Sequence, residues 1–401
     1  MRRKNLPKRT KRIQRTLEYV KKDKDQKPKV FSCFLLTFCC FLLIASNPAL
    51  AKTLTVDPQG LADFCSIQAA VDQAQEGDTV LVYAGEYYEN VFVGKRLALI
   101  AKNTFFSSGG ERNLNDTNFG SSEVKVTESE VQLQQVNTEK TAFFKDFSAT
   151  NAFLLPADPA KPALEIRAGN VTVRDFTIQT RESKRTGVGI LLSGAKNCTL
   201  LNNMIMDMKR GIYLYNCTDC FLEENDLRSN LEALVLENSS SNLLRRNCME
   251  WGKNGVYLKA SDENRLFENR AEGFSSGFRL EECERNIIES NTADCNNLEG
   301  FYLLKAKENQ LRNNRVIENF QYGISLETST GNTLAQNDVQ DNIQGITLKA
   351  ASRENKVYDN QLFYCEKGLL VSEDSTENQI YNNTIRLWKT SNKSWLEELL
   401  D

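Results

Sequence analysis

Histidine is absent from all 401 residues of the chain. A hydrolase built on a nucleophilic triad normally uses histidine as its base, so that class of enzyme is excluded. Imidazole is also the commonest protein ligand for transition metals, and the chain has none to offer. Enzymatic chemistry is expected from acidic residues, together with a lysine or arginine, and a soft-metal site from sulfur.

Beyond the first 29 residues, acidic residues outnumber basic ones. Residues 1–29 hold thirteen lysines and arginines against three acidic residues, and the rest of the chain carries a net charge of about −13. A surface of this sign repels nucleic acid and anionic lipid, so neither is an expected partner of the body of the protein.

The basic segment runs into residues 30–51, which carry no charge. This stretch ends in Ala49, Leu50 and Ala51, a small-x-small pattern typical of signal-peptide cleavage, which predicts a mature chain beginning at Lys52. An uncleaved membrane anchor is the alternative, because the apolar run nears the length that spans a bilayer. In both cases the positive flank stays cytoplasmic, so the body is expected in the periplasm, at the cell surface or outside the cell.

The body is dominated by an internal repeat of 22 residues that lengthens to 23. One asparagine marks every repeat, at Asn203, Asn225, Asn247, Asn269, Asn291, Asn314, Asn337, Asn360 and Asn383. Five residues before each stands a second asparagine, replaced in the first two repeats by Cys198 and Cys220. A glycine follows eight or nine residues later, with Ala233 as the exception. A period of this length indicates a repeat architecture.

Apolar residues alternate with polar ones in three short runs per repeat, as at Ile212 and Leu214 after one of the glycines. A period of two indicates strands. Such short strands bury an apolar face only if each repeat forms one turn of a coil, stacked in parallel on the next at about 4.8 Å. The sequence therefore predicts an all-β fold, a parallel β-helix with about twelve coils.

The repeated asparagines are expected to shape the turns between these strands. Asparagine tolerates the left-handed backbone conformation, and stacked amides can hydrogen-bond along a column. Glycine is expected at the third turn, where a positive φ is commonly needed. The asparagines are therefore interpreted as structural, and their abundance is no evidence of an active site.

The pattern N-x-[ILV]-x-x-N-x-[ILV] followed by glycine resembles the repeat of the pectin-lyase-like superfamily, especially its NosD-like, periplasmic copper-binding type. The resemblance covers about residues 52–388 and implies a right-handed β-helix. It is not specific for function, because this scaffold hosts lyases, hydrolases, esterases, epimerases and proteins that are not enzymes. It also implies a link with copper, although the chain lacks imidazole.

Both ends of the β-helix are expected to carry helical caps that protect the sheet edges. Residues 67–74 form the predicted amino-terminal cap, with Ser66 as its N-cap residue. The periodicity breaks at residues 104–162, which we interpret as an excursion from the coils. The predicted organisation is a leader (1–51), a β-helix (52–388) and a carboxyl-terminal capping helix (389–401).

Sulfur-bearing residues gather in two neighbouring repeats. The candidates for a Cu(I) site are Met204, Met206, Met208, Cys217 and Cys220. Thioether and thiolate groups suit this ion, but the same residues could simply fill strand and turn positions, and no cofactor is required by the sequence. Cys198 and Cys220 share one position in adjacent coils, so an exported protein could join them in a disulfide; two stacked thiols are the alternative.

Outward-facing rows mostly alternate in charge, as Glu223 and Arg245 do, which predicts a solvated ladder of ion pairs. One row differs, because it carries Tyr213, Tyr257 and Tyr302 on alternate coils, roughly 10 Å apart. Sugars stack on such rings, so this row is a candidate glycan-binding surface. The alternative is that tyrosine is favoured on any sheet surface.

These observations predict an exported, monomeric, non-catalytic β-helix protein that binds a glycan or a cell-envelope partner through the tyrosine row or the 104–162 excursion. The alternative is a carbohydrate-active enzyme, a polysaccharide lyase or glycoside hydrolase, whose acidic residues come from different coils. A weaker alternative is a copper-delivery accessory protein.

Overall fold

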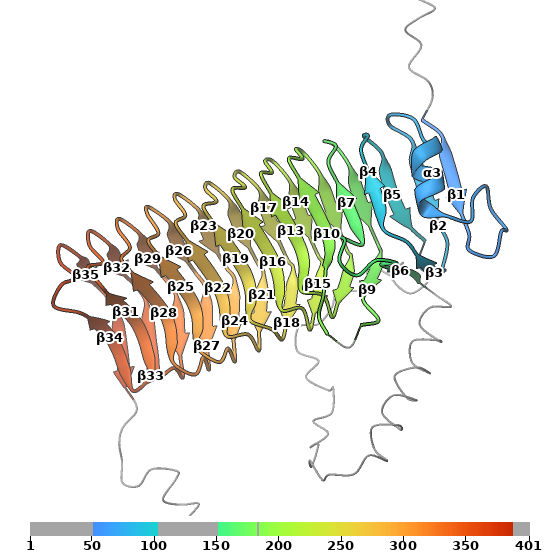
Figure 1. Cartoon of the computed structure of the whole chain (residues 1–401). Coiled ribbons are helices and arrows are strands. Elements are labelled where there is room, and N and C mark those ends of the chain that lie inside the picture. The colour runs from blue at the N-terminus through green and yellow to red at the C-terminus, as the bar shows by residue number, and fades with distance from the viewer. Residues whose placement is uncertain (1–50, 103–150, 183, 388–401) are drawn as a thin grey trace, which may run out of the picture. The chain divides into compact units, whose positions relative to one another are not determined.

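The computed structural model describes residues 51–102, 151–182 and 184–387. Within these ranges the chain winds into a parallel β-helix in which most coils give one strand to each of three sheets (Figure 1). We name the sheets A, B and C; they contain 13, 12 and 11 strands respectively. The predicted all-β, parallel β-helix of about twelve coils is confirmed.

The strands of each sheet recur at every third place along most of the chain. Sheet A comprises β1 (Thr53–Val56), β2 (Thr79–Val82), β5 (Ala98–Ala101), β8 (Thr172–Arg174), β11 (Thr199–Leu201), β14 (Phe221–Glu223), β17 (Leu243–Arg245), β20 (Arg265–Phe267), β23 (Ile287–Glu289), β26 (Gln310–Arg312), β29 (Thr333–Ala335), β32 (Lys356–Tyr358) and β35 (Gln379–Tyr381). Sheet B comprises β3 (Gly85–Tyr88), β6 (Ala152–Leu155), β9 (Thr177–Gln179), β12 (Met204–Met206), β15 (Asp226–Arg228), β18 (Cys248–Glu250), β21 (Arg270–Glu272), β24 (Thr292–Asp294), β27 (Arg315–Ile317), β30 (Asp338–Gln340), β33 (Gln361–Cys365) and β36 (Thr384–Leu387). Sheet C comprises β4 (Val91–Val93), β7 (Leu164–Ile166), β10 (Val188–Ser193), β13 (Arg210–Tyr215), β16 (Glu232–Glu237), β19 (Asn254–Lys259), β22 (Ser276–Glu281), β25 (Glu299–Leu304), β28 (Tyr322–Glu327), β31 (Gln344–Lys349) and β34 (Lys367–Val371).

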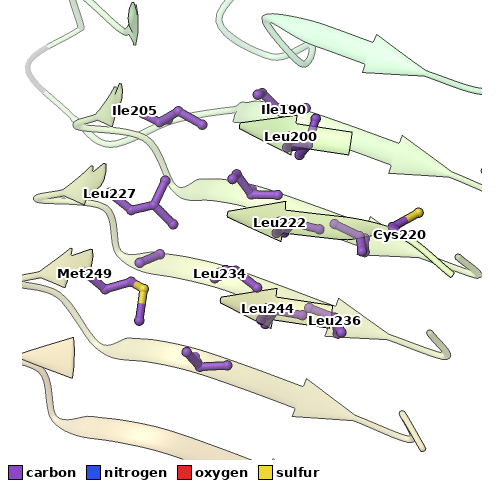
Figure 2. Packing of buried hydrophobic residues seen from close by; sticks show 14 of the residues in the cluster. Ile190, Leu200, Ile205, Cys220, Leu222, Leu227, Leu234, Leu236, Leu244 and Met249 are labelled. Carbon is purple, nitrogen blue, oxygen red and sulfur yellow. The ribbon is translucent and has the colours of Figure 1, made fainter. Parts of the chain in front are cut away.

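The core consists of columns of aliphatic side chains that run from coil to coil (Figure 2). Leu200, Leu222 and Leu244 stack along sheet A, and Ile205 and Leu227 along sheet B. All five are fully buried. Burying one such side chain stabilises the fold by roughly 1.5–3 kcal/mol, so the repeated columns supply the main driving force for stacking.

The asparagine ladder runs in a single file along the turns between sheets A and B. Each side-chain amide Nδ2 donates to the Oδ1 of the asparagine one coil later, as Asn247 does to Asn269 and Asn269 to Asn291, both at 2.9 Å. The Asn269 Nδ2 also donates to the Leu244 carbonyl at 2.9 Å, and its Oδ1 accepts the Asn247 backbone N–H at 3.0 Å. Each side-chain amide therefore forms hydrogen bonds with buried backbone groups that have no partner in a neighbouring strand.

Of the two reasons that we gave for asparagine at these turns, the hydrogen bonding of stacked amides is confirmed, and the left-handed backbone is wrong. The residue with a left-handed backbone is the one before each ladder asparagine, for example Glu224 (φ 54), Arg246 (φ 52) and Glu268 (φ 55). Since charged residues occupy this position, the turn does not select for asparagine through its backbone. The ladder position requires a side chain that both donates and accepts in a buried place.

The repeated glycines also serve a different purpose from the one expected. Gly300, like the corresponding glycines of the other repeats, does not have a positive φ. A Cβ atom at Gly300 would lie 2.5 Å from the Val316 side chain and 2.8 Å from the Gly323 carbonyl oxygen. At Gly300 consecutive coils approach too closely for a Cβ atom, whereas the equivalent position of one other repeat accommodates the methyl group of Ala233.

The sequence analysis missed two further files of hydrogen-bonded side chains. Asn296 donates to Asn319 at 2.8 Å, and Asn319 donates to Asn342 at 3.1 Å, at the turn between sheets B and C. At the turn between sheets C and A, the Ser239 hydroxyl accepts the Cys217 N–H at 3.0 Å. Buried polar side chains thus connect neighbouring coils at all three turns.

The amino-terminal cap is confirmed as α3 (Ile67–Gln73), and the Ser66 hydroxyl accepts the Ala69 N–H at 3.2 Å, as an N-cap should. Glu89 also accepts the Ile67 N–H at 2.9 Å. The range predicted as an excursion, 104–162, contains β6. This strand pairs with β3 and β9 inside the stack, and its four residues are all buried, so this part of the range belongs to the coils. The leader and the predicted cap at 389–401 lie outside the described residues. In the described part of the chain, no helix is long and apolar enough to cross a membrane.

Replacing one ladder amide should destabilise the whole stack. In Asn269→Ala, the buried N–H groups of Asn247 lose their acceptor and the Leu244 carbonyl loses its donor. Each buried group left unpaired costs about 1–3 kcal/mol, so we expect the free energy of unfolding to fall by at least about 3 kcal/mol. Chemical denaturation measures it, with Asn297→Ala on the exposed surface as the control. Equal losses in both variants would contradict the role of the ladder.

Candidate functional site

The predicted tyrosine row lies on the outer face of sheet C. Strand register places Tyr213, Tyr257 and Tyr302 on β13, β19 and β25, with Val235 and Arg279 at the intervening positions. The tyrosines therefore recur on every second strand, as the sequence predicted.

Each tyrosine hydroxyl donates a hydrogen bond to a glutamate on the same outer face, which lies on the next strand, two positions beyond the residue that pairs with the tyrosine. The pairs are Tyr213 with Glu237 at 2.6 Å, Tyr257 with Glu281 at 2.9 Å, and Tyr302 with Glu327 at 2.9 Å. Burial, followed by the glutamate contact, raises the pKa of Tyr257 and of Tyr302 to about 12. The hydroxyls thus stay protonated and the rings are held in fixed orientations. The sequence analysis missed these glutamates, although the constant spacing of 24 or 25 residues could have revealed them.

Cationic side chains lie against the tyrosine rings. The Arg279 guanidinium is 5.6 Å from the Tyr257 ring centroid and 4.9 Å from that of Tyr302. Arg210 lies 4.3 Å from the Tyr213 ring. Cations within about 6 Å of a ring are attracted to its face. A stacked sugar would therefore share these faces with, or displace, a side chain of the protein itself.

Fixed charges of both signs surround the rings. Lys259 pairs with Glu237 at 4.0 Å, and Arg279 with Glu281 at 3.0 Å. Although burial opposes the ionised form, hydrogen bonds from Arg279 and Tyr257 hold the pKa of Glu281 below its ordinary value. The face thus combines aromatic rings with carboxylates, which accept hydrogen bonds from hydroxyl groups, and with cations, which donate hydrogen bonds to them.

A second polar cluster lies on the outer face of sheet B. Arg270 on β21 pairs with Glu272 at 2.7 Å and with Asp294 on β24 at 3.2 Å. Burial is the main cause of a raised pKa at Asp294, and it outweighs the nearby arginines. Two carboxyl groups from adjacent coils thus meet one guanidinium. This cluster could not be predicted from the sequence, because pairing across coils depends on side-chain orientation.

Of the predicted Cu(I) residues, only Cys217 and Cys220 lie together. Met204 and Met206 flank the inward-pointing Ile205 on sheet B, so their side chains face outward, while Met208 is fully buried. Cys217 and Cys220 are also buried, and Figure 2 shows Cys220 across the core from Ile205. Within the ranges that the structure describes, no group of three or more Cys, Asp or Glu side chains could hold a metal ion.

Three buried cysteines meet between sheets C and A. The Cys220 thiol is hydrogen-bonded to the thiols of Cys198 and Cys217, and these bonds together with burial raise its pKa. Cys217 Sγ also donates to the Leu192 carbonyl at 3.4 Å, as the Ser239 hydroxyl does to Leu214 one coil later at 3.2 Å. The thiols therefore replace ladder side chains. All three are free thiols in this structure, and the disulfide stays a prediction.

The disulfide prediction is checked by peptide mapping. Protein exported under oxidising conditions is alkylated without reduction, digested and analysed by mass spectrometry. We expect a linked Cys198–Cys220 peptide, because the two residues occupy equivalent places on neighbouring coils, within disulfide reach. Cys283→Ser removes a buried thiol elsewhere in the stack and should leave the link intact. Alkylation of both Cys198 and Cys220 in the wild type would refute the link.

Comparisons with known proteins agree with this architecture. A family model described as periplasmic copper-binding protein (NosD) matches residues 166–270 and 244–387. The solved A-module of mannuronan C-5 epimerase AlgE6 from Azotobacter vinelandii is similar, with a TM-score of 0.60, 15% identity, and coverage of 80% of this chain and 90% of that one. The AlgE4 A-module from the same organism gives a TM-score of 0.55 and 15% identity, covering 81% and 93%. DFA-IIIase from Arthrobacter chlorophenolicus A6 gives 0.51 and 13%, covering 87% and 98%. No curated protein sequence matches.

At such low identities the solved structures support the shared fold alone. The family description names copper, and the predicted donors among the described residues do not form a single copper site. The chain contains no histidine. Met204 and Met206 face outward, away from the buried cysteines. The thiols of Cys217 and Cys220 already donate hydrogen bonds to backbone carbonyl groups. No chemistry through copper is therefore derived for this chain.

Proposed function

The chain belongs to the NosD family, described as periplasmic copper-binding proteins, and we propose that it is an exported, non-catalytic β-helix protein that binds a glycan along sheet C. The regular tyrosine row carries this proposal. Export is supported by the family description and by the sequence of the leader. The contact surface is the outer face of sheet C between Tyr213 and Tyr302.

The repetition of the face suits an extended polymer. Each tyrosine, with its glutamate, presents the same chemistry on every second coil, so an unbranched chain lying along the axis meets an equivalent contact roughly every 10 Å. Each contact combines a ring face for the apolar side of a sugar with charged groups that accept or donate to its hydroxyls. A periodic ligand would gain from all three positions at once.

The rigidity of the face favours binding. The tyrosine hydroxyls are already bonded to glutamates and the rings lie on a sheet held by the core. Little side-chain freedom remains to be lost when a ligand docks, and this loss is one of the main costs of association. The outer face of sheet C therefore offers preorganised contacts.

Removal of the rings should weaken binding selectively. A glycan array identifies the ligand of the wild-type protein, and titration calorimetry compares variants. We expect Tyr257→Ala and Tyr302→Ala each to lower affinity at least about tenfold, which corresponds to about 1.4 kcal/mol. Tyr381→Ala, an exposed tyrosine on sheet A, is the control and should bind normally. Absence of any ligand, or equal affinity in all variants, would count against the proposal.

A carbohydrate-active enzyme is the second candidate, and the cluster on sheet B favours it. Acid–base cleavage of a glycosidic bond needs one protonated carboxyl group beside one ionised carboxylate. Burial raises the pKa of Asp294, which is the direction that a proton donor needs, and Arg270 holds Glu272 and Asp294 together at 2.7 Å and 3.2 Å. Both carboxyl groups lie on neighbouring strands of one face.

Assays for reducing ends and for unsaturated products, run on a polysaccharide panel, separate the two candidates. Turnover by the wild type would reject the non-catalytic proposal. If sheet B is the catalytic site, Asp294→Asn should lower the rate at least about a hundredfold, and wild-type activity should fall as pH rises through the raised pKa of Asp294. Asp338→Asn, on β30 of the same face, should stay active. Turnover that survives Asp294→Asn would exclude this cluster.

A further inference from the structure

Ser325 on β28 is unusual among the buried serines of the described part of the chain. It lies in the same outward row as Tyr302, yet it is 0% exposed. Its Oγ atom has no hydrogen-bond partner, whereas every other buried serine described has one. A buried hydroxyl without a partner is costly, so its presence in a candidate binding face requires an explanation.

The side chains around Ser325 are already partnered with one another. Lys349 pairs with Glu327 at 3.3 Å, and its ammonium lies 5.8 Å from the Tyr302 ring centroid and 4.8 Å from that of Tyr322. Thr347, the neighbour of Ser325 on β31, donates to Gln344 at 3.1 Å. The Ser325 hydroxyl therefore remains available beside two aromatic rings.

The lysine that lies against these rings is not firmly held. The side chains of Lys349 and Glu327 are 32% and 33% exposed, and an ion pair with this much solvent contact contributes little to stability. The ammonium can move off the rings while staying near Glu327 and water. Displacement would leave open the faces of Tyr302, on the neighbouring strand β25, and of Tyr322, on the same strand as Ser325.

We propose that Ser325 is the anchor of a sugar subsite on sheet C, where a neutral sugar ring stacks on Tyr302 and Tyr322 in place of the Lys349 ammonium and bonds the Ser325 hydroxyl. This inference rests on the proposed function and identifies the class of ligand. A serine hydroxyl both donates and accepts, as a sugar hydroxyl does. Glu327 and Lys349 already balance each other's charge, so an uncharged ring fits the subsite without leaving a charge unpaired.

The matched variants are Ser325→Ala and Ser276→Ala. Ser276 is also buried on sheet C, but its hydroxyl donates to Glu299 at 2.6 Å. Calorimetry with the best glycan from the array should show at least about a tenfold loss of affinity in Ser325→Ala and none in Ser276→Ala. Thermal unfolding without ligand should show no loss of stability in Ser325→Ala, because the deleted hydroxyl has no partner.

The outcomes separate this inference from the proposed function. A wild-type protein that binds no glycan rejects both. Glycan binding that Ser325→Ala leaves unchanged rejects the subsite alone, and so does a lower unfolding temperature for Ser325→Ala, which would show that the hydroxyl is bonded in the free protein.

Two further comparisons test the class of ligand and the displacement of the lysine. Neutral oligosaccharides should bind better than polyuronates of equal length, and the reverse preference contradicts the neutral ring. Lys349→Met removes the ammonium from the rings and should tighten binding of the neutral ligand. Weaker binding in this variant contradicts displacement.

Discussion

The hydrogen bonds of the ladder asparagines determine the geometry on which every other feature depends. At the turns between sheets, backbone N–H and carbonyl groups are buried and cannot join a strand ladder. Amides such as Asn247 and Asn269 satisfy these groups within and between coils. Because the file is continuous, each coil is held in register with the next. The same register aligns the outward rows, and hence places the tyrosines of sheet C at a constant spacing.

The fold could be predicted from the sequence because two periods determine it. The 22-residue period identifies the coils, and the period of two within each coil assigns Leu222 to the core and Tyr213 to the surface. The backbone at the turns could not be read in this way. Asparagine is conspicuous in the sequence, but the residue with the left-handed backbone is the one before it. Residues such as Glu224 and Arg246 at that position do not indicate a left-handed conformation by their type.

The candidate site was predictable only in part, for a related reason. The position of Tyr302 in an outward row follows from register alone. Its contacts with Glu327 and Lys349 depend on how long side chains lie across neighbouring coils, and the lack of a partner at Ser325 depends on all of them together. The pairing of Arg270 with Asp294 on sheet B is of the same kind. Periodicity gives the positions of these residues but not their side-chain orientations.

The central claim is that a glycan lies along the outer face of sheet C. The most direct measurement is a crystal structure of the protein with an oligosaccharide bound at saturation. The account predicts sugar rings against Tyr257 and Tyr302, parallel to the axis of the coils, with a sugar hydroxyl at Ser325. Sugar density on sheet B beside Arg270 and Asp294, with sheet C unoccupied, would contradict it.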